Sequence, residues 1–211
     1  MTTDLQTSRT LGLLGSLLLV IGIPVSLVGG PFGWGIALIG IILVLIALKG
    51  FADQYNEHGI FTKALYGVIL NIVGVVVAVA VVVVAALGFL VSVGLTNLAD
   101  WQAYQQIDWA SIITLDAILP FLGALLAGFL ILFVFVIIGA LFLQKSFTLL
   151  GEKTGVKLFG TAGLILLIGA VLTIVLIGFC LLYLALILIT VGFYSIKPPA
   201  APVSSTPPSS S

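Results

Sequence analysis

The sequence predicts an all-α fold, an integral membrane bundle of six transmembrane helices with an interfacial amphipathic helix in the outer loop. Two observations lead to this prediction. Hydrophobic residues make up 62% of the 211 residues and charged residues only 7%, whereas a soluble domain contains about 25% charged residues. The apolar residues also form runs of roughly the 20 residues that a helix needs to cross a bilayer. A chain with so little charge cannot cover a water-facing surface, so we expect it to fold in a membrane.

Three regions follow from this pattern. Residues 1–10 are polar and are expected as a cytoplasmic N-terminal segment, and residues 11–196 are expected as the membrane domain. Residues 197–211 are rich in proline and serine, which predicts a disordered cytoplasmic tail. The six spans are expected at about residues 11–28, 32–48, 61–90, 120–143, 158–176 and 179–196.

The first two spans are separated by the turn signal Gly29-Gly30-Pro31. The third apolar run is rich in valine, which is a poor helix former in water. In lipid, however, an open strand would leave backbone groups without hydrogen-bond partners, so a helix is expected. At about 1.5 Å per residue, this helix is longer than the roughly 30 Å hydrocarbon core and must tilt or project beyond it.

The outer loop, residues 92–119, contains three aspartates and neither Lys nor Arg. Its aromatic residues Trp101, Tyr104 and Trp109 predict an interfacial helix whose rings lie at the level of the lipid headgroups. Trp34, at the start of the second span, is expected as a further interfacial anchor.

The last apolar stretch, residues 158–196, is too long for one span. A single helix of this length would reach about 58 Å, compared with a hydrocarbon core of roughly 30 Å. Two spans joined by a tight turn near Ile177 and Gly178 fit better, although no strong turn dipeptide marks this position.

The basic residues support six spans independently. With this count, all seven lie on one side of the membrane: Arg9, Lys49, Lys63, Lys145, Lys153, Lys157 and Lys197. A five-span arrangement would place Lys197 on the other side. The positive-inside rule therefore predicts a multi-pass protein of the cell membrane with both termini in the cytoplasm.

The two cytoplasmic connectors resemble each other. Aligned 96 positions apart, they share Phe51/Phe147, Gly59/Gly155, Gly67/Gly163, Ile69/Ile165 and Leu70/Leu166. Each connector joins an even-numbered span to the next one in the same orientation. Two explanations remain open, a parallel internal duplication as found among transporters and coincidence in a chain rich in glycine and leucine.

Three segments resemble a known family. They are ALKGFADQYNEHGIFTKALYGVI at residues 47–69, SFTLLGEKTGVKLFGTAGL at residues 146–164 and VGFYSIKPP at residues 191–199. They are similar to an uncharacterised membrane-protein family, catalogued as domain of unknown function 996 and found mainly in archaea. The resemblance covers about residues 10–199. It implies a multi-span membrane protein and carries over no catalytic or binding residue.

Several function classes are disfavoured by the residues themselves. The net charge is zero and no arginine cluster is present, which argues against nucleic-acid binding. His58 and Cys180 are the only histidine and cysteine, and the metalloprotease pattern H-E-x-x-H is absent. We therefore expect no enzymatic activity, no metal and no cofactor.

Polar residues within the spans give the one candidate site, at Asn71, Thr173 and Tyr183. Asn71 lies about ten residues into the third span. It is expected either to form a hydrogen bond between helices or to bind a substrate or ion. Apart from Lys63, at the cytoplasmic start of the third span, no charged residue lies inside a span, which disfavours transport coupled to protons or ions.

Small residues four positions apart, such as Gly74 with Ala78 and Gly123 with Ala127, allow helices to approach closely. They fit packing inside the bundle or, alternatively, the contact face of a homo-oligomer. The sequence thus predicts a non-enzymatic packing, scaffold or interaction protein in contact with membrane lipids. The alternative is an uncoupled transporter or pore for a small solute or a lipid-like molecule.

Overall fold

The computed structural model describes residues 5–29, 31–92, 115–175 and 177–197. Its helices are α1 (Leu5–Gly29), α2 (Pro31–Gln54), α3 (Gly59–Ser92), α6 (Leu115–Thr154), α7 (Leu158–Leu172), the 3-10 helix η1 (Thr173–Val175) and α8 (Ile177–Ser195). Six of them are long and apolar enough to cross a membrane. The prediction of an all-α membrane bundle with six spans is therefore confirmed.

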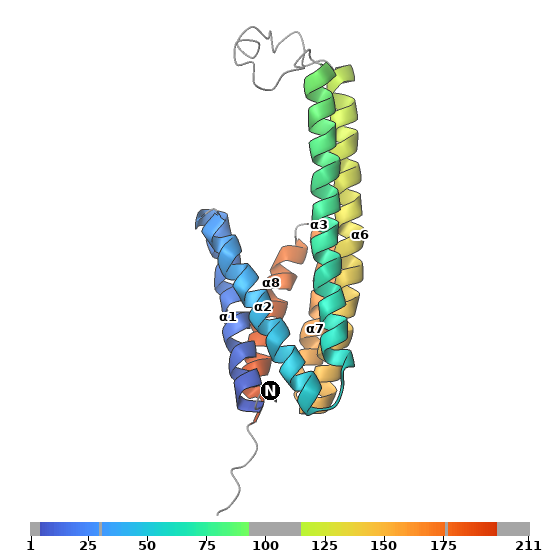
Figure 1. Ribbon diagram of the computed structural model, residues 1–211. Coiled ribbons are helices and arrows are strands. Elements are labelled where there is room, and N and C mark those ends of the chain that lie inside the picture. Colours follow the sequence, from blue (N-terminus) through green and yellow to red (C-terminus); the bar gives the residue numbers. More distant parts are fainter. Residues whose placement is uncertain (1–4, 30, 93–114, 176, 198–211) are drawn as a thin grey trace, which may run out of the picture.

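The six long helices form three hairpins, in which α1 packs on α2, α3 on α6, and α7 on α8 (Figure 1). The α7–α8 hairpin connects the other two, because α7 also contacts α6 and α8 also contacts α1. The α3–α6 hairpin is the longest and extends well beyond the other four helices (Figure 1). The α1–α2 hairpin leans away from it, and α2 approaches α3 at the end where the first connector joins them (Figure 1).

The helices continue past the apolar runs that the sequence shows. Helix α1 begins at Leu5, within the segment expected to precede the first span, and α6 continues through polar residues to Thr154. With 40 residues, α6 is about 60 Å long, roughly twice the thickness of a hydrocarbon core. A helix does not have to end where its side chains become polar, because water solvates the outer face of its last turns.

The turn between the last two spans lies earlier than expected. The chain leaves α7 through η1 at Thr173–Val175, and Gly178 lies inside α8. A Cβ atom on Gly178 would collide with the backbone of Gly169 and Thr173. This glycine therefore allows the close approach of α7 and α8, and the expectation of a turn at Ile177 and Gly178 was wrong.

The core lies at the end where the three hairpins meet. Phe51, Phe159 and Phe193 are completely buried there. The ring centroids of Phe159 and Phe193 lie 5.0 Å apart in an edge-to-face arrangement, and those of Phe51 and Phe193 lie 6.1 Å apart. Such aromatic pairs stabilise a core beyond the area that they bury. One aromatic cluster thus holds α2, α7 and α8 together.

The two connectors have the same backbone geometry, but in a different register from the expected one. Asn56 and Gly155, which both have positive φ (51° and 71°), lie 99 positions apart. Two backbone hydrogen bonds of the first connector have counterparts 99 positions later in the second. The Ile60 N–H donates to the Glu57 carbonyl, as the Phe159 N–H does to the Val156 carbonyl. The Thr62 N–H donates to the His58 carbonyl, as the Thr161 N–H does to the Lys157 carbonyl. The structural equivalence is therefore 99 residues. The alignment at 96 residues paired glycines and aliphatic residues that do not occupy equivalent places.

The aromatic residues of the outer loop, Trp101, Tyr104 and Trp109, and the interfacial helix expected there lie outside the described residues.

Candidate functional site

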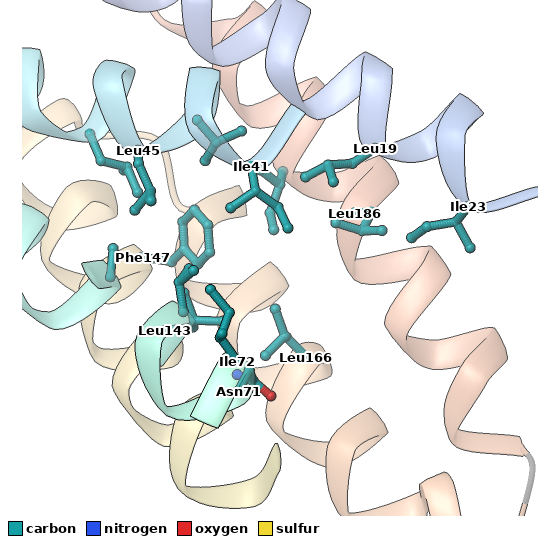
Figure 2. A pocket seen from close by; sticks show the side chains of 15 residues that line it. Leu19, Ile23, Ile41, Leu45, Asn71, Ile72, Leu143, Phe147, Leu166 and Leu186 are labelled. Carbon is teal, nitrogen blue, oxygen red and sulfur yellow. The ribbon is translucent and has the colours of Figure 1, made fainter. Parts of the chain in front are cut away.

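A crevice lies between the α1–α2 and α3–α6 hairpins, and residues of all six long helices line it (Figure 2). Its cavity volume is about 280 Å³. The lining residues are Leu19 and Ile23 of α1, Ile41, Val44, Leu45 and Leu48 of α2, Ala64, Val68, Asn71 and Ile72 of α3, Leu143 and Phe147 of α6, Leu166 of α7, and Leu186 and Ile189 of α8.

The position of the crevice follows from the divergence of the hairpins. Val44, Leu48, Phe147 and Ile189 belong both to its lining and to the buried core, so the core closes one end of the crevice. Farther from the core, α2 and α3 separate (Figure 1). Side chains from α1, α7 and α8 also line the space between them. The result is a largely aliphatic space near the junction of all three hairpins.

Among the described residues that line the crevice, Asn71 is the only polar one. Its Nδ2 atom donates a hydrogen bond of 2.8 Å to the Gly67 carbonyl, one turn earlier in α3. The same nitrogen packs against Gly139 of α6, where an added Cβ atom would collide with it. Gly67 faces the same crossing, because a Cβ atom there would lie 2.8 Å from the Gly139 carbonyl oxygen. Two glycines thus allow α3 and α6 to meet beside the amide of Asn71.

The structure does not bring the other two candidate residues to this place. The hydroxyl of Thr173 donates to the Gly169 carbonyl at 2.9 Å, within its own hairpin. The hydroxyl of Tyr183 donates to the Val20 carbonyl at 3.2 Å and so links α8 to α1. Neither residue lines the crevice. Of the three polar residues predicted from the sequence, only Asn71 belongs to this site.

The seven basic residues lie toward the end of the bundle that contains the connectors and the end of α8. Arg9 donates hydrogen bonds to the carbonyl oxygens of Phe193 (3.3 Å) and Tyr194 (2.7 Å), which lie in the last turn of α8. A cation is favoured at this end of a helix, where carbonyl groups lack intrahelical partners. Lys153 of α6 pairs with Glu57 of the first connector at 3.4 Å, on the surface.

Trp34, the residue expected as an interfacial anchor, lies at the opposite end of α2 and is 68% exposed.

Two contacts were not predicted from the sequence. Ser146 is completely buried and donates a hydrogen bond of 2.6 Å from α6 to the Ile60 carbonyl of α3. Arg9 contacts a residue 185 positions away. Neither has a local signal, because each depends on which helix ends meet in three dimensions. The crevice itself has no sequence signal either, since its aliphatic lining has the same composition as the lipid-facing surface.

The chemistry of the lining is limited. The lining side chains that the structure describes are aliphatic apart from Phe147 and Asn71, so these residues supply neither an acid–base group nor a nucleophile. Within the described ranges, no group of three or more His, Cys, Asp or Glu residues is arranged to hold a metal ion. The site can therefore accept an apolar molecule and offer it one amide group.

Comparison with known proteins gives a family without an assigned activity. The family model described as protein of unknown function (DUF996) matches residues 36–187. The uncharacterized protein MJ1644 of Methanocaldococcus jannaschii is 29% identical over 193 residues, which cover 92% of this chain and 93% of that protein. No solved structure matches the chain. Because the family model spans well over half of the sequence, the chain belongs to the DUF996 family of proteins of unknown function.

Proposed function

We propose that this protein is a non-enzymatic multi-pass membrane protein that holds a lipid-like, apolar molecule in the crevice between its hairpins. The supporting observation is the crevice itself, about 280 Å³ of largely aliphatic space to which all six long helices contribute. An aliphatic cavity of about 150 Å³ stays dry and binds benzene. A larger cavity with the same kind of lining favours an apolar occupant over water or a polar solute.

The lining also favours a function that is not coupled to an ion gradient. Intramembrane sites for protons or ions usually retain a charged side chain despite its cost. The described lining residues include no charged side chain, and Asn71 is the one polar residue among them. This supports the uncoupled binding or transport of a lipid-like molecule over a polar pore, which would need a continuous hydrophilic lining.

A scaffold role is the second candidate, and the α3–α6 hairpin is the observation that favours it. Outside its contacts with the other helices, this hairpin exposes large apolar side chains over most of its length, for example Val76, Val84 and Leu126. In a bilayer this surface contacts lipid or the helices of a partner, including a second copy of this chain. Small residues such as Gly74 and Gly128 pack within the hairpin, so they are not available for an oligomer face.

The orientation that we propose places the basic end of the bundle in the cytoplasm and the protein in the cell membrane. The positive-inside rule supports this orientation, because the basic residues gather at one end of the helices. A cysteine at Lys197, in a Cys180→Ala background, is expected to react with a membrane-impermeant thiol reagent only after cells are opened. Labelling of intact cells would reverse the proposed orientation.

Native mass spectrometry of the protein extracted with its lipids tests the main proposal, because it counts subunits and weighs bound molecules. We expect a defined apolar molecule on the wild-type protein and on Val76→Trp, whose side chain lies on the outward face and is 61% exposed. Val68→Trp places an indole in the crevice and should lose that molecule. Equal retention by both variants would place the ligand elsewhere. A bare homo-oligomer would instead support the scaffold role.

A further inference from the structure

Two equivalent parts of the chain share one pattern of buried positions. The first unit, residues 39–69, consists of the C-terminal part of α2, the first connector and the start of α3. The second unit, residues 138–168, consists of the corresponding parts of α6 and α7 with the second connector. The spacing of 99 residues that relates the connectors also relates buried residues of their helices, namely Ala47/Ser146, Leu48/Phe147, Phe51/Leu150, Ala52/Gly151, Ile60/Phe159 and Ala64/Gly163.

The helices of the second unit are closed on each other. A Cβ atom on Gly163 of α7 would lie 3.2 Å from both the Cα atom and the carbonyl oxygen of Gln144 in α6. A Cβ atom on Gly151 of α6 would lie 3.3 Å from the backbone nitrogen of Gly160 in α7. Glycine at these two positions thus allows the backbones of α6 and α7 to approach closely.

The first unit is open at the same place. The counterparts of Gly163 and Gln144 are Ala64 of α3 and Leu45 of α2, and both of these residues line the crevice. Helices α2 and α3 are in less extensive contact than α6 and α7, and α2 leans away from α3 (Figure 1). The crevice therefore lies where the corresponding helices of the second unit touch.

The side chains at this crossing favour the open arrangement without forbidding the closed one. The first unit has Ala52 and Ala64 where the second has Gly151 and Gly163. Each alanine adds a methyl group between the helices, and a separation larger by a few tenths of an ångström would accommodate it. An apolar space without an occupant favours closure instead, because its lining forfeits dispersion contacts. These opposing effects give the first unit two accessible arrangements.

We infer that the first unit closes when the crevice is empty, with α2 moving onto α3 as α6 lies on α7, and that an apolar ligand holds it open. This inference rests on the proposed function and adds the regulation of the same site. A ligand in the crevice binds only the open arrangement and so shifts the population toward it. Ala64 sets the balance, because it is completely buried at the crossing that must close.

Distances between spin labels test this inference on the whole protein in phosphatidylcholine nanodiscs. In a Cys180→Ala background, one pair of labels is attached at Ile39 and Ile69, and the matched control pair at their counterparts Ile138 and Ile168. All four isoleucines are exposed and none lines the crevice. We expect one distance from the control pair in every sample. The first pair should give a long distance, which added decane populates, and a shorter one close to that of the control pair.

Two substitutions should move the balance in opposite directions. Ala64→Gly removes the methyl group at the crossing and should raise the ratio of the short to the long distance about fivefold, which corresponds to the lower limit of the cost of overpacking. Val68→Trp places an indole in the crevice and should leave the long distance alone. Ala80→Gly removes a methyl group from an exposed position of α3 and should keep the wild-type ratio, as the matched control.

The outcomes separate this inference from the proposed function. A single long distance in every sample, Ala64→Gly included, would overturn the inference, while native mass spectrometry measures the bound apolar molecule independently. A short distance that persists in Val68→Trp would also overturn it, because closure would then not depend on the crevice. If both variants behave as expected but decane neither binds nor lengthens the distance, the proposed function is overturned and the closure itself is supported. The wild-type comparison with and without decane needs neither variant.

Discussion

Replacement of Gly139 by alanine tests the close crossing of α3 and α6, which positions Asn71. The added Cβ atom would lie 2.9 Å from the Gly67 carbonyl oxygen and would collide with Asn71 Nδ2. The amide can rotate away, but the carbonyl belongs to the backbone of α3. The two helices must therefore separate by several tenths of an ångström along a tightly packed crossing. Gly123, on the same helix, has no atom within 4 Å of the equivalent position and serves as the matched control.

The expected magnitude follows from two opposing effects. Overpacking at a tight contact costs about 1–3 kcal/mol, whereas alanine in place of glycine stabilises a helix by roughly 0.5–1 kcal/mol. Gly139→Ala should therefore lose about 1 kcal/mol of the free energy of unfolding, and Gly123→Ala should gain up to about 1 kcal/mol. The difference of about 2 kcal/mol corresponds to roughly 4–8 °C in Tm for a chain of this size.

The assay is thermal unfolding of both variants in one detergent, followed by circular dichroism. We expect Gly139→Ala to melt below the wild-type protein and Gly123→Ala at or above it. Adding Asn71→Ala to Gly139→Ala should recover only part of the loss, because the Gly67 carbonyl still blocks the new methyl group. If Gly139→Ala is as stable as Gly123→Ala, α3 and α6 do not cross at these glycines.

Three further substitutions concern the basic end of the bundle. Ser146→Ala removes a buried hydrogen bond to the Ile60 carbonyl and should cost about 1 kcal/mol, measured as a lower Tm. Arg9→Ala removes two hydrogen bonds to the last turn of α8 and should cost about 1–2 kcal/mol, seen as faster amide hydrogen exchange in that turn. Lys153→Met breaks the exposed pair with Glu57 and should change Tm by less than the equivalent of about 0.5 kcal/mol.

Each substitution has its own control. Ser195→Ala removes an exposed hydroxyl that bonds only to its own helix and should have little effect on Tm, so an equal loss would contradict the role of Ser146. Arg9→Lys should restore less than half of the protection, because an ammonium group cannot donate the two forked bonds of a guanidinium. Full protection with lysine would show that charge alone matters. A large loss in Lys153→Met would mean that the pair is part of a wider network.

Part of the fold can be predicted from local composition. The number of spans follows from the length of the apolar runs, and the shared end of the basic residues follows from their place between those runs. The turn after α7 was misplaced because Gly178 looks like a turn residue, yet it serves a helix crossing. The predicted alignment of the two connectors was wrong by three residues, because coincidental identities outnumbered the identities at structurally equivalent positions. The positive φ of Asn56 and Gly155 becomes visible only in the folded backbone.

The sequence by itself determined that this protein folds in a bilayer. With 62% hydrophobic and 7% charged residues, its helices are stable in lipid and could not cover a water-facing surface. Only the tertiary structure decided that Asn71 enters a crevice while Thr173 and Tyr183 bond to backbone elsewhere. The reason is physical. In a membrane, residues that face lipid and residues that face the core are equally apolar, so no polar stripe on a helix shows which side faces inward. Contacts between glycines such as Gly67 and Gly139 set the crossings instead, and they join residues far apart in the chain.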